Sequence, residues 1–268
     1  MFPVQARTRH LPAYAIAALS VGMLLSSAVW AMPAPQQAAS KASAAPAPKR
    51  DLTGVWQLQG TGSAESAVPD KDMPPMTPWA KVRFDAEKPG YGPRGAPGGN
   101  DPILQCDPIG FPRIMYMPLP MEFVQVPGRM VQFFEREHEY RTIWTDGRSL
   151  PQDADPTWYG YAIGRWEGDD TFVVESSGFN DKTWLAPTGY PHSEDMRITE
   201  RYRRLDSDTI QYQITITDPT AYARPAVGPP RIYKRKPGAE LEELPCVWSE
   251  ENSFTKRIRE PAASKPAK

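Results

Sequence analysis

The stretch RITERYRRLDSDTIQYQITIT, residues 197–217, decides the fold. Its second half places Ile210, Tyr212, Ile214 and Ile216 at every second position, with polar residues between them. This is the period of a β-strand that buries one face. Asp206-Ser207-Asp208 is a turn signal, so the stretch predicts a β-hairpin formed by residues 197–205 and 209–217.

The first half of the same stretch carries a carboxylate in an unusual place. Ile198, Glu200 and Tyr202 share one face of the predicted strand, and Arg197, Thr199, Arg201 and Arg203 share the other. Glu200 therefore lies on the apolar side. An ionisable group in an apolar setting has its pKa displaced, which is one way in which general acids and bases are made.

Similar patterns extend along the chain and predict an antiparallel sheet. The expected strands are 51–58, 123–126, 129–144, 158–166, 171–176, 197–205, 209–217, 231–235 and 241–248, with Cys246 on the last. Thr77-Pro78 predicts the start of one short N-terminal helix whose buried stripe is Trp79, Val82 and Phe84. About eight to ten strands curl rather than stay flat. We therefore expect an all-β fold, an antiparallel calycin-like β-barrel, with a bent β-sandwich as the alternative.

The two ends of the chain differ in composition from the middle. Residues 1–31 have a basic start, an apolar run and a small-residue cleavage site, as in a signal peptide, so the mature protein is expected to be periplasmic or secreted, with no membrane span after cleavage. Residues 32–50 predict an Ala/Pro-rich flexible linker and 253–268 a flexible tail. Residues 51–252 then form a single barrel domain.

Charge and cysteine content restrict the partners. Removal of the predicted signal peptide takes away Arg7 and Arg9 and leaves 29 of the 31 basic residues and 32 acidic ones. The resulting net charge of −3 does not favour nucleic acid as a partner. The mature chain has two cysteines, Cys106 and Cys246, and in an oxidising compartment an isolated pair usually forms a disulfide. A catalytic or metal-binding thiol is the competing interpretation, although no CxxC or matching His spacing supports it.

Two residues are candidates for acid–base chemistry. If strand 129–144 is continuous, His138 shares a face with Phe134 and Tyr140, while a row of glutamates faces water. His138 and Glu200 would then both line the barrel and could act as catalytic acid and base. The alternative is that each is satisfied by a neighbour such as Arg136 or Tyr202.

The loop that precedes the hairpin gathers the candidate substrate-binding residues. These are Asn180, Asp181, Trp184, His192 and Glu194, with Tyr161 from an earlier strand. We expect residues 179–195 to form an ordered lid that carries His192 toward the cavity. The alternative is that Asn180 and Asp181 only cap a turn while His192 faces solvent. The loop has no metal-ligand spacing of a known motif, and we predict neither a metal nor a cofactor.

Four blocks resemble an uncharacterised family of exported bacterial proteins: CDPIGFPR (106–113), GRWEGD (164–169), GFNDKTW (178–184) and PHSE (191–194). The resemblance covers about Asp51 to Asn252 and implies a common fold without supplying a chemistry. Members of that family often carry a second His before the PHSE proline, where this chain has Tyr190. Separately, Gly54-Val55-Trp56 resembles the first strand of lipocalin and other calycin barrels, in which the Trp packs against the barrel floor.

Three functions follow from these observations. The leading one is a barrel that processes a small, largely apolar molecule by hydratase, lyase, isomerase or hydrolase chemistry through an interior acid/base pair. The second is a binding or carrier protein without chemistry, which an arginine-paired Glu200 would favour. The third is an envelope scaffold with a filled barrel. The sequence does not fix the oligomeric state.

Overall fold

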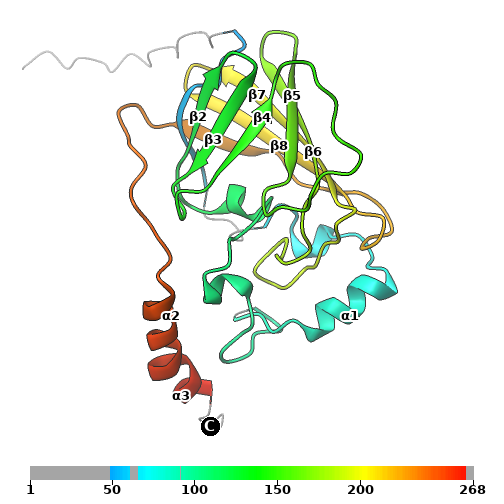
Figure 1. Cartoon of the computed structure of the whole chain (residues 1–268), viewed down its shortest axis with the longest axis vertical. Helices are drawn as coiled ribbons and strands as arrows, with labels where there is room; N and C mark the ends of the chain where they lie inside the picture. The colour runs from blue at the N-terminus through cyan, green and yellow to red at the C-terminus, as the bar shows by residue number, and fades with distance from the viewer. Residues whose placement is uncertain (1–48, 61–65, 91, 264–268) are drawn as a thin grey trace, which may run out of the picture. The chain divides into compact units, whose positions relative to one another are not determined.

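A closed barrel of mixed strands forms the body of the protein (Figure 1). The computed structural model describes residues 49–60, 66–90 and 92–263, so the predicted signal peptide and most of the predicted linker lie outside the described residues. Among the described residues, nine strands close the barrel: β1 (Gly54–Leu58), β2 (Met121–Val126), β3 (Arg129–Phe134), β4 (Tyr140–Trp144), β5 (Tyr161–Glu167), β6 (Thr171–Ser177), β7 (Arg197–Asp206), β8 (Thr209–Thr217) and β10 (Arg231–Arg235).

Strand β10 closes the barrel because it pairs with β1 on one side and with β8 on the other. The short strand β9 (Ala226–Val227) pairs only with β8, beside this junction. The predicted barrel is thus confirmed, and the sandwich alternative does not apply.

One pair of neighbouring strands is parallel, and here the prediction of a wholly antiparallel sheet is wrong. Ile143 and Trp144 of β4 pair in parallel with Ala162 and Ile163 of β5. The chain between them, residues 145–160, is a long connection without a strand of its own, which lets β5 start from the same end of the barrel as β4. The other strand pairs are antiparallel.

The predicted strand 129–144 is broken in the middle. Residues 135–139 form a tight turn between β3 and β4, in which Glu137 and His138 adopt positive φ angles of 57° and 53°. This left-handed backbone reverses the alternation of side chains. As a result Tyr140 is 59% exposed, whereas Arg141 turns into the interior.

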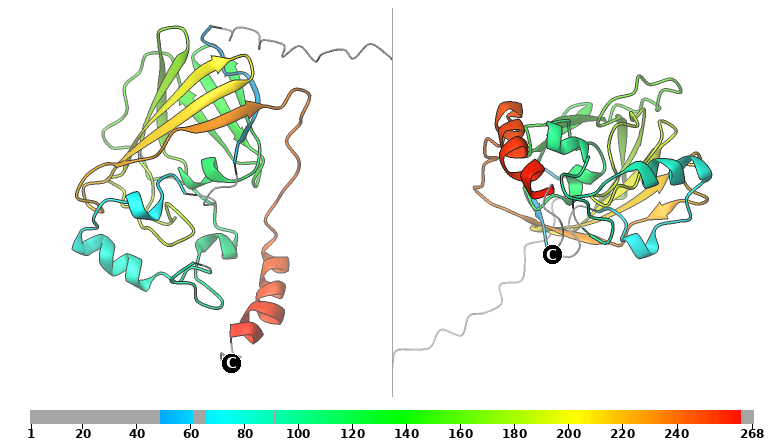
Figure 2. Two further views of the ribbon diagram at one scale, coloured as in Figure 1. Left: turned by 180° about the vertical axis from the view of Figure 1, so that it is seen from behind. Right: turned by 90° about the horizontal axis from the view of Figure 1, so that it is seen from below.

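Short helices and one long loop gather at the same end of the barrel (Figures 1 and 2). They are η1 (Asp70–Asp72), α1 (Pro78–Ala86), η2 (Pro102–Gln105) and η3 (Arg113–Tyr116), with the loop 178–196. The predicted start of α1 is confirmed, because the Thr77 hydroxyl accepts a hydrogen bond of 3.3 Å from the Ala80 amide. Val82, however, is 70% exposed and not part of a buried stripe.

The C-terminal segment departs from the prediction. Residues 241–248 were expected to close the sheet, but residues 241–247 lie outside it and Trp248 starts a helix. The segment meets the β3–β4 turn through an isolated bridge between Arg136 and Leu244 and through hydrogen bonds of Glu242. The disulfide between Cys106 and Cys246 is confirmed. Beyond it the chain is helical as far as Ala263, through α2 (Trp248–Phe254), the π-helical turn η4 (Thr255–Arg259) and α3 (Glu260–Ala263).

Aromatic side chains fill the barrel. Trp56, Phe123, Phe172 and Tyr233 are at most 1% exposed, and each such burial contributes about 1.5–3 kcal/mol. The Trp56 indole donates a hydrogen bond to the Leu52 carbonyl at 2.8 Å, and the Arg204 guanidinium lies 4.7 Å from the ring. None of the helices in the described part of the chain has the length and apolar character that a membrane crossing requires.

Candidate functional site

Strand β7 carries Glu200 into the barrel, as its alternation predicts. Ile198, Glu200, Tyr202 and Arg204 are buried, and the residues between them are exposed. Pairing with β6 on one side and β8 on the other holds this strand in the centre of the antiparallel half of the sheet.

A cluster of polar side chains surrounds Glu200. The Oε1 atom of Glu200 accepts hydrogen bonds from Arg141 Nη2 at 2.8 Å, from the Tyr202 hydroxyl at 2.5 Å and from the Tyr212 hydroxyl at 3.2 Å. Arg141 Nε donates to Gln132 Oε1 at 2.7 Å. We call these five residues the interior polar cluster: Gln132, Arg141, Glu200, Tyr202 and Tyr212. All are at most 3% exposed.

The electrostatics of the cluster act on Arg141 and on the two phenols. Burial alone opposes the charge on Arg141, but the Glu200 carboxylate outweighs it and raises the pKa of Arg141. Burial, reinforced by the Glu200 charge, raises the pKa of Tyr202 and of Tyr212 well above the usual value of a phenol. Both phenols therefore stay neutral donors at neutral pH, and the arginine stays charged. Arg141 and Glu200 thus form a buried ion pair with two phenol donors at Oε1. Among the described residues, Glu200 Oε2 and Arg141 Nη1 have no hydrogen-bond partner.

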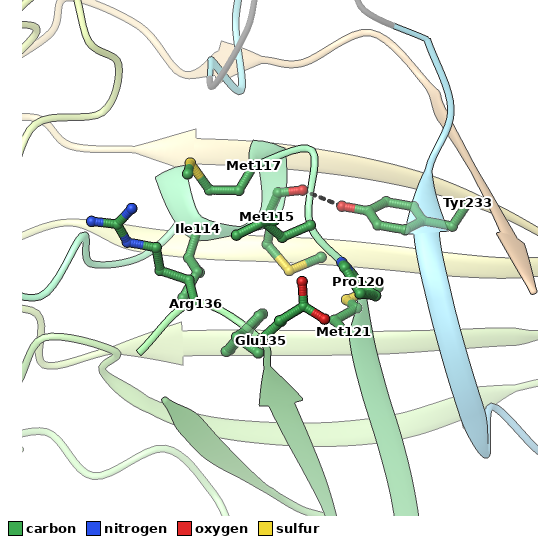
Figure 3. Close-up of a pocket in the computed structure, with 10 residues that line it drawn as sticks. Ile114, Met115, Met117, Pro120, Met121, Glu135, Arg136 and Tyr233 are labelled. Atoms are coloured by element: carbon green, nitrogen blue, oxygen red, sulfur yellow. Dashed lines mark hydrogen bonds between the residues drawn. The ribbon is translucent and has the colours of Figure 1, made fainter. Parts of the chain in front are cut away.

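A small pocket lies next to the methionines that Gln132 contacts, and no residue of the cluster lines it. Figure 3 shows the pocket where η3, β2 and the end of β3 meet Tyr233, whose hydroxyl donates to the Met115 carbonyl. Its volume is about 10 Å³, enough for about one water molecule. Gln132 reaches the sulfurs of Met115 and Met121 at 3.1 and 2.9 Å, so methionine side chains fill this part of the interior. A substrate of ordinary size does not fit there.

The predicted pairing of His138 with Glu200 is not formed. His138 lies on the β3–β4 turn, is exposed, and its Nε2 contacts the Glu242 carbonyl at 3.0 Å. The expected inward orientation assumed a continuous strand, and the left-handed turn removes that assumption. Arg141, which the same assumption placed on the solvent face, is the partner of Glu200. The break in the alternation after Glu135 has no sequence signal that would have identified it.

His192 is buried, but against protein and not against a cavity. It is 1% exposed, and its Nε2 lies 2.8 Å from the Thr183 hydroxyl. Desolvation lowers the pKa of His192, against the opposing effects of the Ser193 carbonyl and of Asp218 and Asp181. Thr183 in turn packs against Gly110, where an added Cβ would lie 2.5 Å from the Thr183 methyl. The contact joins the GFNDKTW and PHSE blocks to the CDPIGFPR block.

The other candidate residues of the loop do not converge on one site. Asn180 is buried and its side chain accepts from the Lys182 amide at 3.1 Å, as in a turn cap. Trp184 is buried and hydrogen bonds the Glu87 carboxylate. Burial raises the pKa of Glu87, and the bond from Trp184 lowers it by less. Asp181 and Glu194 are exposed. Tyr161 lies on β5 and accepts from Arg148 at 3.0 Å.

A surface cleft that the sequence interpretation missed lies at the helical end of the barrel. Its apolar lining residues include Met73, Pro74, Pro75, Met76, Phe84 and Tyr190, and Asp70 and Lys81 are the charged ones. We call it the apolar cleft. Its volume is about 580 Å³, within the range of small-molecule sites. The sequence MPPMTP at 73–78, which contains methionine and proline and no charged residue, is the feature that could have indicated the cleft.

The apolar cleft joins segments that are distant in sequence. The Phe84 and Tyr190 rings are 4.9 Å apart, and the Arg94 guanidinium covers the Phe84 ring at 3.6 Å while its Nη1 donates to the Thr188 carbonyl. Helix α1 and the loop 178–196 therefore hold the two aromatic walls. Burial raises the pKa of Tyr190, so its hydroxyl is neutral at neutral pH.

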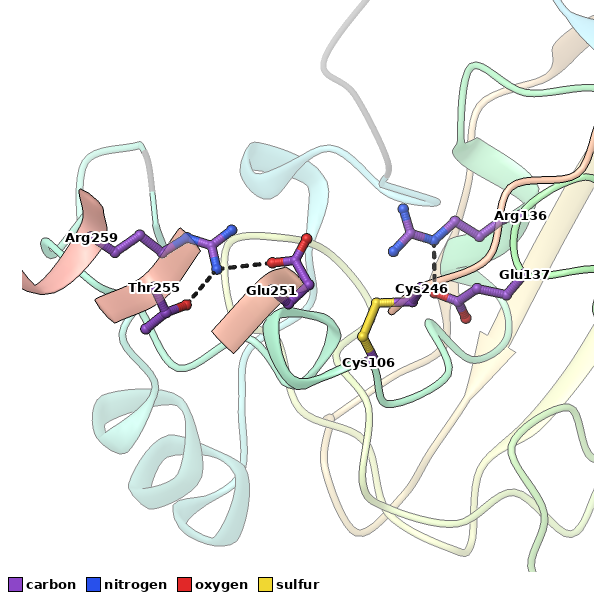
Figure 4. The surroundings of a disulfide bond; sticks show 7 residues. All are labelled: Cys106, Arg136, Glu137, Cys246, Glu251, Thr255 and Arg259. Atoms are coloured by element: carbon purple, nitrogen blue, oxygen red, sulfur yellow. Dashed lines mark hydrogen bonds and ion pairs between the residues drawn. A yellow bond between two sulfur atoms is a disulfide. The ribbon is translucent and has the colours of Figure 1, made fainter. Parts of the chain in front are cut away.

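Within the described residues, no group of three or more His, Cys, Asp or Glu side chains is arranged to hold a metal ion, and both cysteines are in the disulfide (Figure 4). The fold and the sites thus define a closed, mixed β-barrel with a filled interior and an external apolar cleft. A comparison of the sequence with protein-family models gives no match, and a comparison with curated proteins gives none either. The resemblance carried by the four sequence blocks stays a prediction.

Proposed function

We propose that this protein is an exported, non-catalytic binding protein for a small, largely apolar molecule, which occupies the apolar cleft. The observation that carries the proposal is the cleft itself: about 580 Å³ with walls of methionine, proline and two aromatic rings. Pockets of this size and lining are where proteins usually bind small molecules.

The interior polar cluster supports binding without catalysis. Its carboxylate is paired with Arg141 and two phenols, and all four side chains are buried. A general acid or base must come within hydrogen-bond distance of its substrate, which this packing prevents. His138, the other half of the expected pair, is on the outside.

The two charged residues of the cleft lining, Asp70 and Lys81, favour a ligand with little charge. The Lys81 ammonium lies 2.5 Å from both carboxylate oxygens of Asp85, and Asp70 accepts from the Thr188 hydroxyl at 3.2 Å. Each of these two charges therefore already has a partner. A ligand gains mainly from apolar burial, at about 25 cal/mol per Å².

Export fits the same role. The predicted signal peptide and the Cys106–Cys246 disulfide both favour an oxidising compartment outside the cytoplasm, the periplasm or the medium. A calycin-like relationship belongs to this proposal too, supported by the buried Trp56 on β1 and its contact with Arg204.

The test uses the neutral fluorescent probe N-phenyl-1-naphthylamine and two matched variants. Met73→Asp places a charge in the cleft and should weaken probe binding at least about tenfold, the effect of 1.4 kcal/mol. Val82→Asp places the same charge on the exposed side of α1, outside the cleft lining, and should leave binding unchanged.

Equal affinity of the parent and Met73→Asp would reject the cleft as the site. Mass spectrometry of molecules that co-purify with the parent, but not with Met73→Asp, would identify the natural ligand. Turnover of such a ligand that is lost in a Glu200→Gln variant retaining the parent's fold would reject the non-catalytic assignment.

A further inference from the structure

A second cleft lies on the outer face of the barrel, at the ends of three neighbouring strands. Strand β7 lies between β6 and β8, and Arg197 at its start pairs with Thr217 at the end of β8 (Figure 1). Ser177 ends β6 and follows Ser176, which pairs with the inward-facing Ile198. Side chains alternate along a strand, so Ser177 points outward, on the same face as Arg197 and Thr217.

Two loops form the walls of this cleft. The connection 145–160 contributes Ala154, which packs closely against Gly178, where an added Cβ would lie 2.6 Å from the Ala154 Cβ. The loop before β7 contributes Glu194 and Asp195. We call this site the polar cleft. Its volume is about 440 Å³, within the range of small-molecule sites.

The segment that carries Glu194 is held in place from both sides. Ser193 is buried and donates to the Asp218 carboxylate from its amide at 2.7 Å and from its hydroxyl at 2.8 Å. The Ser193 hydroxyl also accepts from the Asp195 amide at 3.1 Å, and the Asp195 carboxylate accepts from the Thr220 hydroxyl at 2.6 Å. Glu194 lies between these two anchored residues, so little backbone order has to be gained when a ligand binds.

Three polar side chains of the cleft have no partner in the described part of the chain. Ser177 is 6% exposed, and its hydroxyl makes no hydrogen bond. Arg197 and Glu194 are exposed, and neither side chain has an ion-pair or hydrogen-bond partner. A buried polar atom without a partner costs free energy, so a ligand that bonds the Ser177 hydroxyl supplies what the free protein lacks.

The charges of the lining select the kind of ligand. Two carboxylates, Glu194 and Asp195, and one guanidinium, Arg197, give it a net charge of −1. A ligand that pairs with all three carries two cationic groups and one carboxylate. A metal ion would instead be repelled by Arg197.

We propose that the polar cleft binds a free basic amino acid of the lysine type. Its carboxylate pairs with Arg197 and accepts from the Ser177 hydroxyl, and its two ammonium groups pair with Glu194 and Asp195. The inference does not depend on the proposed function, because the polar cleft and the apolar cleft share no lining residue.

The experiment is isothermal titration calorimetry of the processed chain, starting at Met32, with L-lysine. Three analogues each lack one charged group: cadaverine the carboxylate, 6-aminohexanoate the α-ammonium and norleucine the ε-ammonium. Lysine should bind saturably, and each analogue at least about tenfold more weakly. No saturable binding of lysine at millimolar concentrations overturns the proposal, and so does an analogue that binds as tightly as lysine.

Two matched variants locate the carboxylate of the ligand. Arg197→Gln should weaken lysine binding at least about tenfold and should not weaken cadaverine binding, since cadaverine has no carboxylate. Arg201→Gln removes an exposed arginine from the same face of β7, outside the cleft lining, and should leave lysine binding unchanged. Equal losses in the two variants would overturn the site.

Ser177→Ala separates contact with the ligand from a role in the fold. The hydroxyl has no partner in the free protein, so the urea midpoint of this variant should equal or exceed that of the parent. Its affinity for lysine should decrease about fivefold, the effect of about 1 kcal/mol. An unchanged affinity overturns the assignment of Ser177 to the ligand. Displacement of N-phenyl-1-naphthylamine by lysine would overturn the separation of the two clefts.

Discussion

The strongest prediction for stability concerns the ion pair inside the barrel. Arg141 and Glu200 are joined at 2.8 Å, with side chains 1% and 0% exposed. Glu200→Gln keeps the shape and an acceptor for the phenols but removes the negative charge. The Arg141 guanidinium is then buried without a counter-charge. Breaking a buried pair in this way costs about 3–5 kcal/mol. For a domain of this size, that lowers Tm by roughly 6–20 °C.

Urea denaturation followed by tryptophan fluorescence measures the loss, with Glu167→Gln as the matched control. Glu167 also accepts from an arginine, Arg201, at 2.7 Å, but its side chain is 41% exposed. An exposed pair contributes about 0–1 kcal/mol, so this variant should stay close to the parent. The same chemical change thus has two different costs, which depend on burial.

A double variant isolates the pair itself. Arg141→Met removes the cation that Glu200→Gln leaves unpaired. The combined cost should therefore be less than the sum of the single costs by about 0.5–3 kcal/mol. A loss of less than about 1 kcal/mol for Glu200→Gln, no greater than that of Glu167→Gln, would refute the reasoning. Strictly additive costs would show that the two residues do not depend on each other.

Two further predictions concern the loop and the disulfide. Folding lowers the pKa of His192, so as pH falls below about 6.5 the unfolded protein binds a proton at this residue before the folded protein does. Stability should therefore decrease in that pH range. In a His192→Gln variant the urea midpoint should decrease less with falling pH. A pH dependence identical to the parent's would show that His192 is not desolvated. The Cys106→Ser, Cys246→Ser double variant should lose about 2–5 kcal/mol. Thiol titration of the unreduced, denatured parent should find no free sulfhydryl, and two free thiols would contradict the structure.

Local alternation predicted the strands where it was unbroken. Strands β7 and β8 match the expected ranges to within one residue, and Glu200 lies on the expected face. The disulfide and the start of α1 also follow from short signals. The parallel pairing of β4 with β5 does not, because it depends on where residues 145–160 lead the chain. The C-terminal helix was not predicted either, because the charged, Pro- and Ala-rich composition of residues 253–268 is typical of a flexible tail.

The candidate site could be predicted only in part, because the alternation of inward and outward side chains does not continue across the turn between β3 and β4. Glu200 was identified from its own strand, but its partner was sought on a strand whose second half has the opposite phase. Two residues with positive φ, Glu137 and His138, turned His138 outward and Arg141 inward. The apolar cleft is assembled from residues about a hundred positions apart, Met73 and Tyr190, which no local pattern connects.

The interior polar cluster also explains how this barrel keeps one register. Its members come from four strands: Gln132 from β3, Arg141 from β4, Glu200 and Tyr202 from β7, and Tyr212 from β8. A slip of one residue in β7 would carry Glu200 to the outer face and leave Arg141 buried alone, at a cost of about 3–5 kcal/mol. Apolar side chains at these positions would tolerate such a slip far better. The carboxylate that first suggested catalysis therefore favours one register of the sheet, and the proposed ligand binding takes place outside the barrel, in the apolar cleft.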